Sequence, residues 1–117
     1  MSKYFIPYIM GDQSFISNLK LLQEHGADIV EIGIPFSDPV ADGPTIMEAG
    51  NKAIAEGMTV EKILEELKLN RKELNGRYVL MTYYNIIHHY GETEFLQDCE
   101  EAGVYGLIIP DLPFELI

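Results

Sequence analysis

Short apolar runs alternate along this chain with stretches of helical periodicity, and this alternation constrains the fold more than any other feature. The apolar runs are rich in β-branched and aromatic residues, and two of them begin shortly after a glycine, Gly26 or Gly103, that ends a helical pattern. Strands joined by helical crossovers pair in parallel. The sequence therefore predicts an α/β fold with the order β-α-β-α-α-β-α-β around a parallel sheet.

The predicted elements follow one another with few residues between them. The first half consists of a strand at Tyr4–Met10, a helix capped by Ser14 and ending near His25, a strand within 28–34, a loop at 35–43 and a helix at Pro44–Glu56. The second half begins with a helix capped by Thr59 over Val60–Leu69, a polar loop at Asn70–Gly76 and a strand at Tyr78–Tyr83. A helix capped by Thr93 and stopped by Gly103 follows, and then a strand at Tyr105–Ile109. Residues 85–90 are compatible with either a loop or a short helix. A helix, a glycine, a strand and a proline recur at Gly26–Pro35 and Gly103–Pro110, as repeated βα units would produce.

The most informative stretch is Asp28–Pro44, which reads D-I-V-E-I-G-I-P-F-S-D-P-V-A-D-G-P. It begins as a strand and then breaks into a loop punctuated by proline and glycine. Because side chains alternate along a strand, Glu31 shares a face with Ile29 and Gly33. Parallel sheets are covered on both faces, so we expect Glu31 to be buried.

A lone buried carboxylate costs several kcal/mol unless it is paired or protonated, so stability alone does not explain Glu31. A functional role is the favoured explanation, because perturbed carboxylates concentrate at functional sites. Two structural explanations stay open: a salt bridge to a Lys or Arg elsewhere in the chain, or an exposed edge strand.

Polar side chains follow each predicted strand at the point where it ends. They are Asp12, Asp38, Asp42, Asn85 and Asp111. The carboxyl ends of parallel strands meet at one edge of a sheet, and ligands of α/β folds bind there. The sequence therefore predicts a ligand site at this edge.

Composition narrows the class of protein. The 117 residues suit one domain, and a hydrophobic content of 47% supports a core. Acidic residues outnumber basic ones by 19 to 8, which gives a net charge of −11 and argues against a nucleic-acid surface. No run of about 18 apolar residues is present, so no membrane segment is expected. Together with a single cysteine, these features lead us to expect a soluble cytoplasmic protein.

The remaining chemically active residues give weak signals. His88 and His89 are adjacent but lack a second cluster of ligands at metal-binding spacing, so no metal site is predicted. Cys99 lies on an apolar helical face without an activating base, which favours a buried core thiol. Ser37 lacks the context of a nucleophile elbow.

Three segments together resemble the tryptophan synthase alpha chain family. They are G-A-D-I-V-E-I-G-I-P-F-S-D-P-V-A-D-G-P-T-I at 26–46, M-T-Y-Y-N at 81–85 and I-I-P-D-L-P at 108–113. The P-F-S-D-P-x-A-D-G-P run is highly specific to that family, and the similarity extends from about Tyr4 to the last residue. Another phosphate-sugar barrel, such as an isomerase of the same pathway, does not share this run and is disfavoured.

The resemblance implies a (β/α)8 TIM barrel that cleaves indole-3-glycerol phosphate to indole and glyceraldehyde 3-phosphate by a retro-aldol step. It implies that Glu31 is the catalytic acid and base and that Asp42 is the catalytic aspartate that binds the indole N–H. A carboxyl with a raised pKa can carry a proton between the glycerol hydroxyl and indole C3. An ionised carboxylate can stabilise the positive charge that develops on the indole.

The resemblance also implies roles for further residues. Tyr8, Met81, Tyr83 and Ile108 correspond to substrate-binding positions, and Pro35, Asp38 and Asp111 to positions that face or couple to a partner. Without the family, Tyr8 and Met81 are equally well explained as core, and Asp38 and Asp111 as turn formers. The implied partner is a beta chain in an alpha2beta2 tetramer. That chain carries pyridoxal phosphate, whereas the alpha chain needs no cofactor.

The chain is short for this family, because a complete barrel takes about 250 residues. Residues 1–117 correspond to about the first four βα units, a single-domain half-barrel whose first and fourth strands would be open edges. The loops after strands 7 and 8, which usually bind phosphate, fall outside it. We therefore expect the catalytic carboxylates without efficient catalysis by this chain alone. The alternative is a non-catalytic half-barrel that self-associates or docks on the beta chain.

Overall fold

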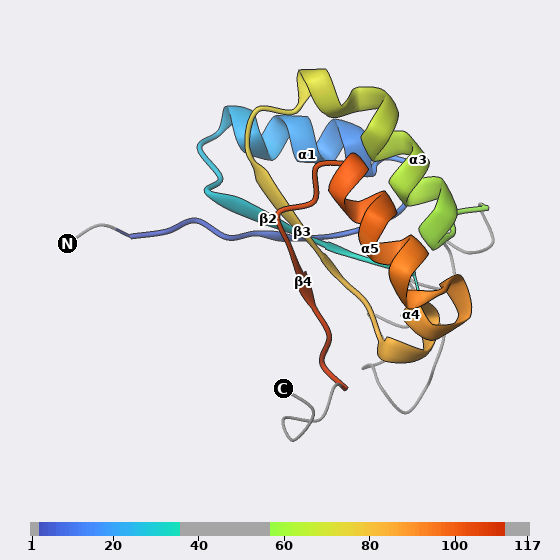
Figure 1. Cartoon of the computed structure of the whole chain (residues 1–117). Coiled ribbons are helices and arrows are strands. Elements are labelled where there is room, and N and C mark those ends of the chain that lie inside the picture. The colour runs from blue at the N-terminus through green and yellow to red at the C-terminus, as the bar shows by residue number, and fades with distance from the viewer. Residues whose placement is uncertain (1–2, 36–56, 112–117) are drawn as a thin grey trace.

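Four parallel strands and the helices between them make up the chain in a computed structural model that describes residues 3–35 and 57–111 (Figure 1). The elements are β1 (Tyr8–Met10), α1 (Phe15–Glu24), β2 (Ile29–Gly33), α3 (Val60–Asn70), the 3-10 turn η1 (Arg71–Glu73), β3 (Arg77–Met81), α4 (Tyr84–Tyr90), α5 (Glu92–Glu101) and β4 (Gly106–Ile108). The strands lie in the order β1-β2-β3-β4, and each neighbouring pair is parallel. The predicted α/β fold with a parallel sheet is confirmed. The predicted helix at 44–56 lies outside the described residues.

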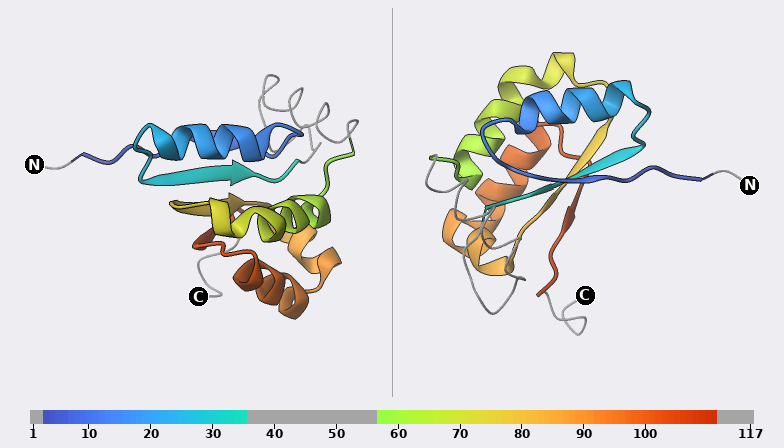
Figure 2. Two further views of the ribbon diagram at one scale, coloured as in Figure 1. Left: turned by 90° about the horizontal axis from the view of Figure 1, so that it is seen from above. Right: turned by 180° about the vertical axis from the view of Figure 1, so that it is seen from behind.

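The described helices lie along one side of the sheet. They occupy the top and right of Figure 1, with the strands beneath them, and the view from behind in Figure 2 (right) shows the same layering. Helix α1 contacts β1 and β2, and α3 lies between α1 and α5, touching both. Within residues 3–35 and 57–111, no helix covers the other face of the sheet, which we call the open face.

The hydrophobic core lies between the sheet and these helices. Alternate residues of the central strands, Val30, Ile32 and Leu80, are completely buried there. The helices contribute the other large side chains that are almost completely buried, which are Phe15, Leu19, Ile63, Leu64, Leu67 and Phe95. Cys99 is also buried in this core, so the predicted core thiol is confirmed.

Two of the three predicted helix caps need correction. Thr59 caps α3 as predicted, because its side chain accepts a hydrogen bond of 3.1 Å from the Lys62 N–H. Ser14 stands at the start of α1 but makes no side-chain capping bond. Thr93 lies inside α5, and the residue before that helix is Gly91, whose φ of 105° few other residues adopt. Gly91 also ends α4, so two helices meet at one glycine.

Several predicted boundaries shift. Regular pairing in the first strand begins at Tyr8, although the preceding residues still run beside β2, where the carbonyls of Phe5 and Pro7 accept hydrogen bonds of 2.9 Å from the amides of Asp28 and Glu31. The third strand ends at Met81, two residues earlier than predicted. The ambiguous segment at 85–90 is helical and belongs to α4, and the polar loop after α3 opens with η1.

The two glycines of the predicted repeat serve the same purpose. Gly26 follows α1 with a φ of 88°, and Gly103 follows α5 with a φ of 79°. This left-handed conformation ends a helix and turns the chain into the next strand at little steric cost. The similarity between the two βα junctions is therefore structural as well as sequential.

Candidate active site

The register of the sheet brings residues from all four strands into rows that share the open face. One row consists of Tyr8, Glu31, Val79 and Gly106, and the next consists of Met10, Gly33, Met81 and Ile108. Side chains of paired residues in parallel strands point to the same face of the sheet. The structure thus brings together four of the predicted site residues, Tyr8, Glu31, Met81 and Ile108.

Glu31 is only partly buried, so the prediction that it is buried is wrong. Its neighbours in sequence, Val30 and Ile32, are completely buried because they point to the helix-covered face. The prediction assumed that helices cover both faces of a parallel sheet, whereas the described helices cover one. The open-edge explanation is also wrong, because β2 pairs with β1 on one side and β3 on the other.

Tyr8 reaches from the edge strand across the open face. Its hydroxyl lies against Gly33, and a Cβ added at Gly33 would overlap this hydroxyl and lie 2.7 Å from the ring carbon Cζ. The ring therefore occupies the space that a side chain at position 33 would need. Tyr8 remains 39% exposed because the open face has no described cover.

Met81 and Ile108 supply apolar surface in the second row. Met81 is half-buried, and Ile108 is 37% exposed. Large side chains of this kind, on the face that carries a carboxylate, suit a flat apolar ligand with a few polar atoms.

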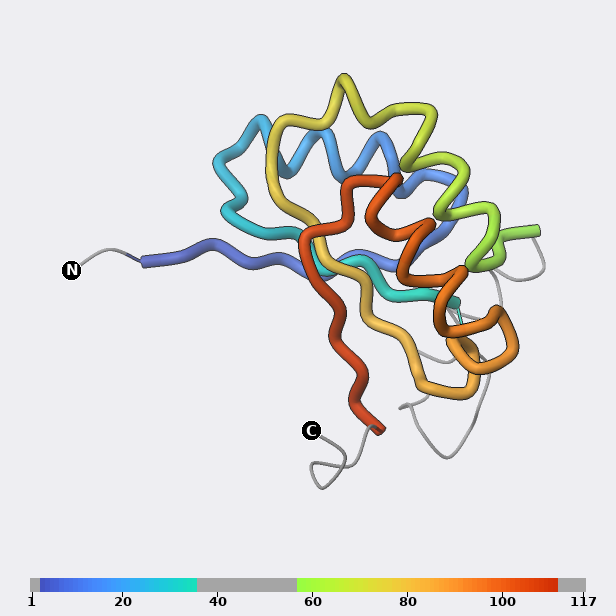
Figure 3. Tube along the Cα trace, in the orientation of Figure 1, coloured from blue at the N-terminus to red at the C-terminus, as the bar shows by residue number. Residues whose placement is uncertain are grey.

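The carboxyl ends of β3 and β4 meet, as the pattern of polar residues predicts. The Asp111 Oδ1 accepts a hydrogen bond of 2.9 Å from the Tyr84 N–H at the start of α4, and the Thr82 N–H donates to the Ile108 carbonyl at 3.0 Å. Figure 3 shows the chain leaving β3 beside the end of β4. Tyr83, half-buried, stands between β3 and α4 at this junction.

The α4 residues next to this junction carry an exposed polar cluster. The Tyr84 hydroxyl donates a hydrogen bond to Glu92, and this bond raises the pKa of Tyr84. The His88 ring stacks against the Tyr84 ring with centroids 6.1 Å apart. Among the described residues, no group of three or more His, Cys, Asp or Glu side chains is arranged to hold a metal ion.

The loop after β2 carries the other predicted residues. Pro35 is buried at the end of this strand. Asp38 and Asp42 lie outside the described residues, so their predicted roles stay predictions.

Sequence reasoning missed two residues of this region. Gly33 accommodates the Tyr8 ring, and a glycine inside a strand was an available signal for such a close approach. Thr82 is 1% exposed, and the signal for its burial was the alternation of the predicted strand, which puts Thr82 on the same face as Tyr78 and Leu80.

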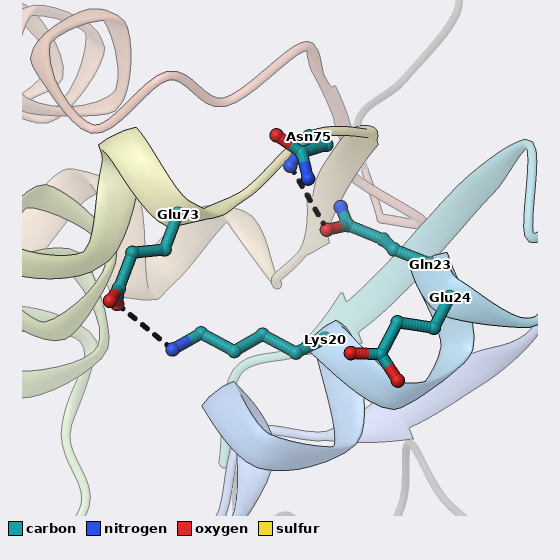
Figure 4. A pocket seen from close by; sticks show the side chains of 5 residues that line it. All are labelled: Lys20, Gln23, Glu24, Glu73 and Asn75. Carbon is teal, nitrogen blue, oxygen red and sulfur yellow. Dashed lines mark hydrogen bonds and ion pairs between the residues drawn. The ribbon is translucent and has the colours of Figure 1, made fainter.

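A separate polar hollow lies between α1 and the start of β3 (Figure 4). The side chains that line it are Lys20, Gln23, Glu24, Glu73 and Asn75. Lys20 Nζ pairs with Glu73 at 2.9 Å, and the Gln23 Oε1 accepts from the Asn75 N–H at 3.3 Å. These bonds join α1 to the amino end of β3, away from the strand ends where Tyr83 and Asp111 lie. Ligand sites of such folds lie at the carboxyl ends, so this hollow has a structural role.

Comparison with known proteins identifies the fold family. A family model described as tryptophan synthase alpha chain matches residues 1–116. The chain belongs to the tryptophan synthase alpha chain family. The resemblance predicted from the three sequence segments is confirmed.

The tryptophan synthase alpha chains that the chain matches are about twice its length. The tryptophan synthase alpha chain of Staphylococcus carnosus is 76% identical over 117 residues, which are 99% of this chain and 47% of that protein. That of Staphylococcus haemolyticus is 66% identical over 116 residues and 48% of its length. The chain spans about half the length of the curated relatives that it matches.

Solved structures of the family share the fold. Tryptophan synthase subunit alpha from Legionella pneumophila superimposes with a TM-score of 0.90 at 36% identity, over 97% of this chain and 45% of that one. Tryptophan synthase from M. tuberculosis, in its aminoacrylate-bound form, gives a TM-score of 0.86 at 36% identity over 96% and 47%. The four-stranded unit is therefore a half-barrel of the TIM-barrel family, as predicted. None of the helices in residues 3–35 and 57–111 is long and apolar enough to cross a membrane.

Proposed function

We propose that this chain carries the first half of a tryptophan synthase alpha active site, for the lyase reaction that converts indole-3-glycerol phosphate to indole and glyceraldehyde 3-phosphate in tryptophan biosynthesis. The observation that supports this most directly is the open face. It brings Glu31, the residue that matches the catalytic glutamate, together with Tyr8, Met81 and Ile108, which match substrate-binding positions. Residues 1–117 form, in this proposal, a single N-terminal domain unit of the barrel.

Glu31 is proposed as the acid and base of the cleavage. The bond between indole C3 and the adjacent glycerol carbon breaks when C3 takes up a proton and the hydroxyl on that carbon loses one. The electrons of the O–H bond form the aldehyde C=O, and those of the broken C–C bond restore the indole ring. One proton is taken up and one is released, so a single carboxyl within reach of both atoms can transfer both protons.

The other predicted residues complete the proposal. Met81 and Ile108 contribute apolar walls for the indole ring, and Tyr8 and Tyr83 aromatic ones. Asp42 is proposed to accept a hydrogen bond from the indole N–H and to stabilise the cationic ring. Pro35, Asp38 and Asp111 are proposed to face or couple to the beta chain, which would bring its own pyridoxal phosphate. The alpha chain is proposed to use no cofactor.

Indole release from indole-3-glycerol phosphate tests this proposal. The 117-residue chain is assayed with and without a beta chain, beside Glu31→Gln and the matched control Glu24→Gln. Both substitutions remove one charge, but Glu24 is exposed at the end of α1, away from the open face. The proposal is supported if wild type and Glu24→Gln release indole and Glu31→Gln does not. Indole from Glu31→Gln at the wild-type rate contradicts it.

A second candidate function is non-catalytic binding, and the incomplete cover of the sheet favours it. Strands β1 and β4 are the edges of the described sheet, and the open face has no described helix over it. The phosphate-binding loops of a TIM barrel usually follow strands 7 and 8, which a unit of four strands does not contain. A half-barrel of this kind would dock on a beta chain or on a second copy of itself without turning over substrate.

Binding and oligomer measurements separate the two candidates. Ultracentrifugation of the chain alone reports self-association, and titration with a beta chain reports docking. Binding without indole release supports the non-catalytic function. Indole release that depends on Glu31 contradicts it.

A further inference from the structure

The contact between Tyr8 and Gly33 bears on how Glu31 is held. Tyr8 and Glu31 are register partners on neighbouring strands, and Gly33 lies two residues beyond Glu31 on the same face. The Tyr8 ring therefore runs diagonally from its own row to the next, because its hydroxyl lies against Gly33. Because register partners on neighbouring strands lie side by side on one face, a ring on this path borders the position of Glu31.

We propose that Tyr8 is a positioning residue for Glu31: its ring, seated in the space above Gly33, forms a wall that keeps the Glu31 carboxylate directed over the centre of the open face. The role of Glu31 as acid and base rests on the proposed function. The positioning itself is a property of the half-barrel, and it can be measured whether or not the chain releases indole.

The backbone around Gly33 is fixed, so the ring and not the strand must respond to a change there. The Gly33 carbonyl accepts a hydrogen bond of 2.9 Å from the Gly11 N–H, and the Ile34 N–H donates to the Met81 carbonyl at 2.9 Å. Strand β2 is thus bonded on both sides. Tyr8 lies on an edge strand and is 39% exposed, so its ring can swing into solvent.

A second glycine on the same face supplies a matched control. A Cβ added at Gly106 would meet only Val79 Cγ1 within 4 Å, at 3.6 Å, which is an ordinary van der Waals contact. Gly33→Ala and Gly106→Ala therefore make the same chemical change on one face of the sheet. The first substitution displaces the Tyr8 ring, and the second leaves it in place.

Solution NMR of the 117-residue chain tests the proposal through the Glu31 side chain. In wild type we expect cross-peaks between the Tyr8 ring and the Glu31 side chain, together with Glu31 couplings typical of one rotamer. Gly33→Ala should lose the cross-peaks, and both Gly33→Ala and Tyr8→Ala should give averaged Glu31 couplings. Tyr8→Phe, which keeps the ring, and Gly106→Ala should match wild type. A variant that combines Gly33→Ala with Tyr8→Ala should show no more averaging of the Glu31 couplings than Tyr8→Ala alone.

Any of three results would overturn the proposal: no Tyr8–Glu31 cross-peaks in wild type, unchanged Glu31 couplings in Tyr8→Ala, or retained cross-peaks in Gly33→Ala. The amide signals of Ile32 and Leu80 report whether each variant keeps its core, and the wild-type spectrum decides even if a variant fails to fold. Where the chain releases indole with a beta chain, Gly33→Ala should lower kcat about tenfold or more, since misplaced catalytic groups lose rate steeply. Absence of indole from every form would count against the proposed function and leave the NMR result standing.

Discussion

The two faces of the sheet differ although they are built from the same strands. On the helix-covered face Val30, Ile32 and Leu80 are completely buried, whereas on the open face Tyr8 and Ile108 are 39% and 37% exposed. Apolar residues occupy both faces, but only the covered one is packed by described helices. The covered face therefore contains the packed core, and within residues 3–35 and 57–111 no helix packs on the open face.

The largest expected effect compares two adjacent residues of β3 that point to opposite faces. Leu80→Ala removes a completely buried side chain and should lower the free energy of unfolding by about 3 kcal/mol. Met81→Ala removes a half-buried side chain from the open face and should cost about 1 kcal/mol. Urea unfolding followed by circular dichroism measures both. Equal costs would break the comparison, because the open face would then be as tightly packed as the covered one.

The next effect concerns the attachment of α5 to the covered face. The Tyr78 hydroxyl donates a hydrogen bond to the carbonyl of Ala102, at the end of α5, and both residues are buried. Burial also raises the pKa of Tyr78. Tyr78→Phe leaves that carbonyl without this donor and should cost about 1 to 2 kcal/mol. Thermal unfolding measures the loss, with Tyr105→Phe as the control because Tyr105 is 61% exposed. An equal loss in both variants would show that the bond contributes little.

A smaller effect tests how the covering helices begin. Thr59→Ala removes the side-chain cap of α3 and should cost about 1 kcal/mol. Ser14→Ala removes no capping bond from α1 and should stay within about 0.5 kcal/mol of wild type. Denaturant midpoints of the two variants give the contrast. A larger loss at Ser14 than at Thr59 would contradict the capping pattern of the structure.

The smallest effect depends on pH and concerns contacts among the helices. Asp98 accepts hydrogen bonds from the Tyr90 hydroxyl and from Lys68 Nζ, and these bonds lower the pKa of Asp98 from its usual value of 3.8. A carboxylate with a lowered pKa in the folded state stabilises the fold above its usual pKa, and this contribution is lost as the pH falls through the lowered value. The Lys68–Asp98 ion pair is partly exposed, so its contribution to stability is small.

Melting temperatures of wild type and Asp98→Asn at pH 7 and near pH 2 test this sign. Wild type should melt higher at pH 7, and the difference should shrink at the acid end. A difference that grows on acidification would mean that the ionised form of Asp98 does not stabilise the contact between α4, α5 and α3.

Much of this architecture was predictable because it depends on local chemistry. The alternation of β-branched runs and helical patterns specified the parallel order, and Gly26 and Gly103 ended their helices as glycines do. Thr59 was recognisable as a cap, whereas Thr93 was not a cap because Gly91 already separates the two helices. A polar residue near a helix start looks the same in sequence whether it caps or not.

The face of the sheet that Glu31 occupies was predictable, and its environment was not. Because side chains alternate along a strand, the sequence placed Glu31 on the face of β2 that does not carry Val30 and Ile32. The carboxyl ends of β3 and β4 also meet, as the pattern of polar residues predicts. The burial of Glu31 was predicted wrongly, because exposure depends on which faces the helices cover. The position of the Tyr8 ring against Gly33 could not be predicted either, because it depends on the register between β1 and β2, which are separated in sequence by α1.

The sequence by itself determined the four strands, their parallel arrangement, most of the described helices and the family, since periodicity, glycine stops and specific motifs are written in neighbouring residues. Only the tertiary structure decided which face is covered, how far Glu31 is exposed and where the Tyr8 ring lies. These properties depend on contacts between strands and helices that are distant along the chain, and a one-residue change in register would move every side chain to the other face.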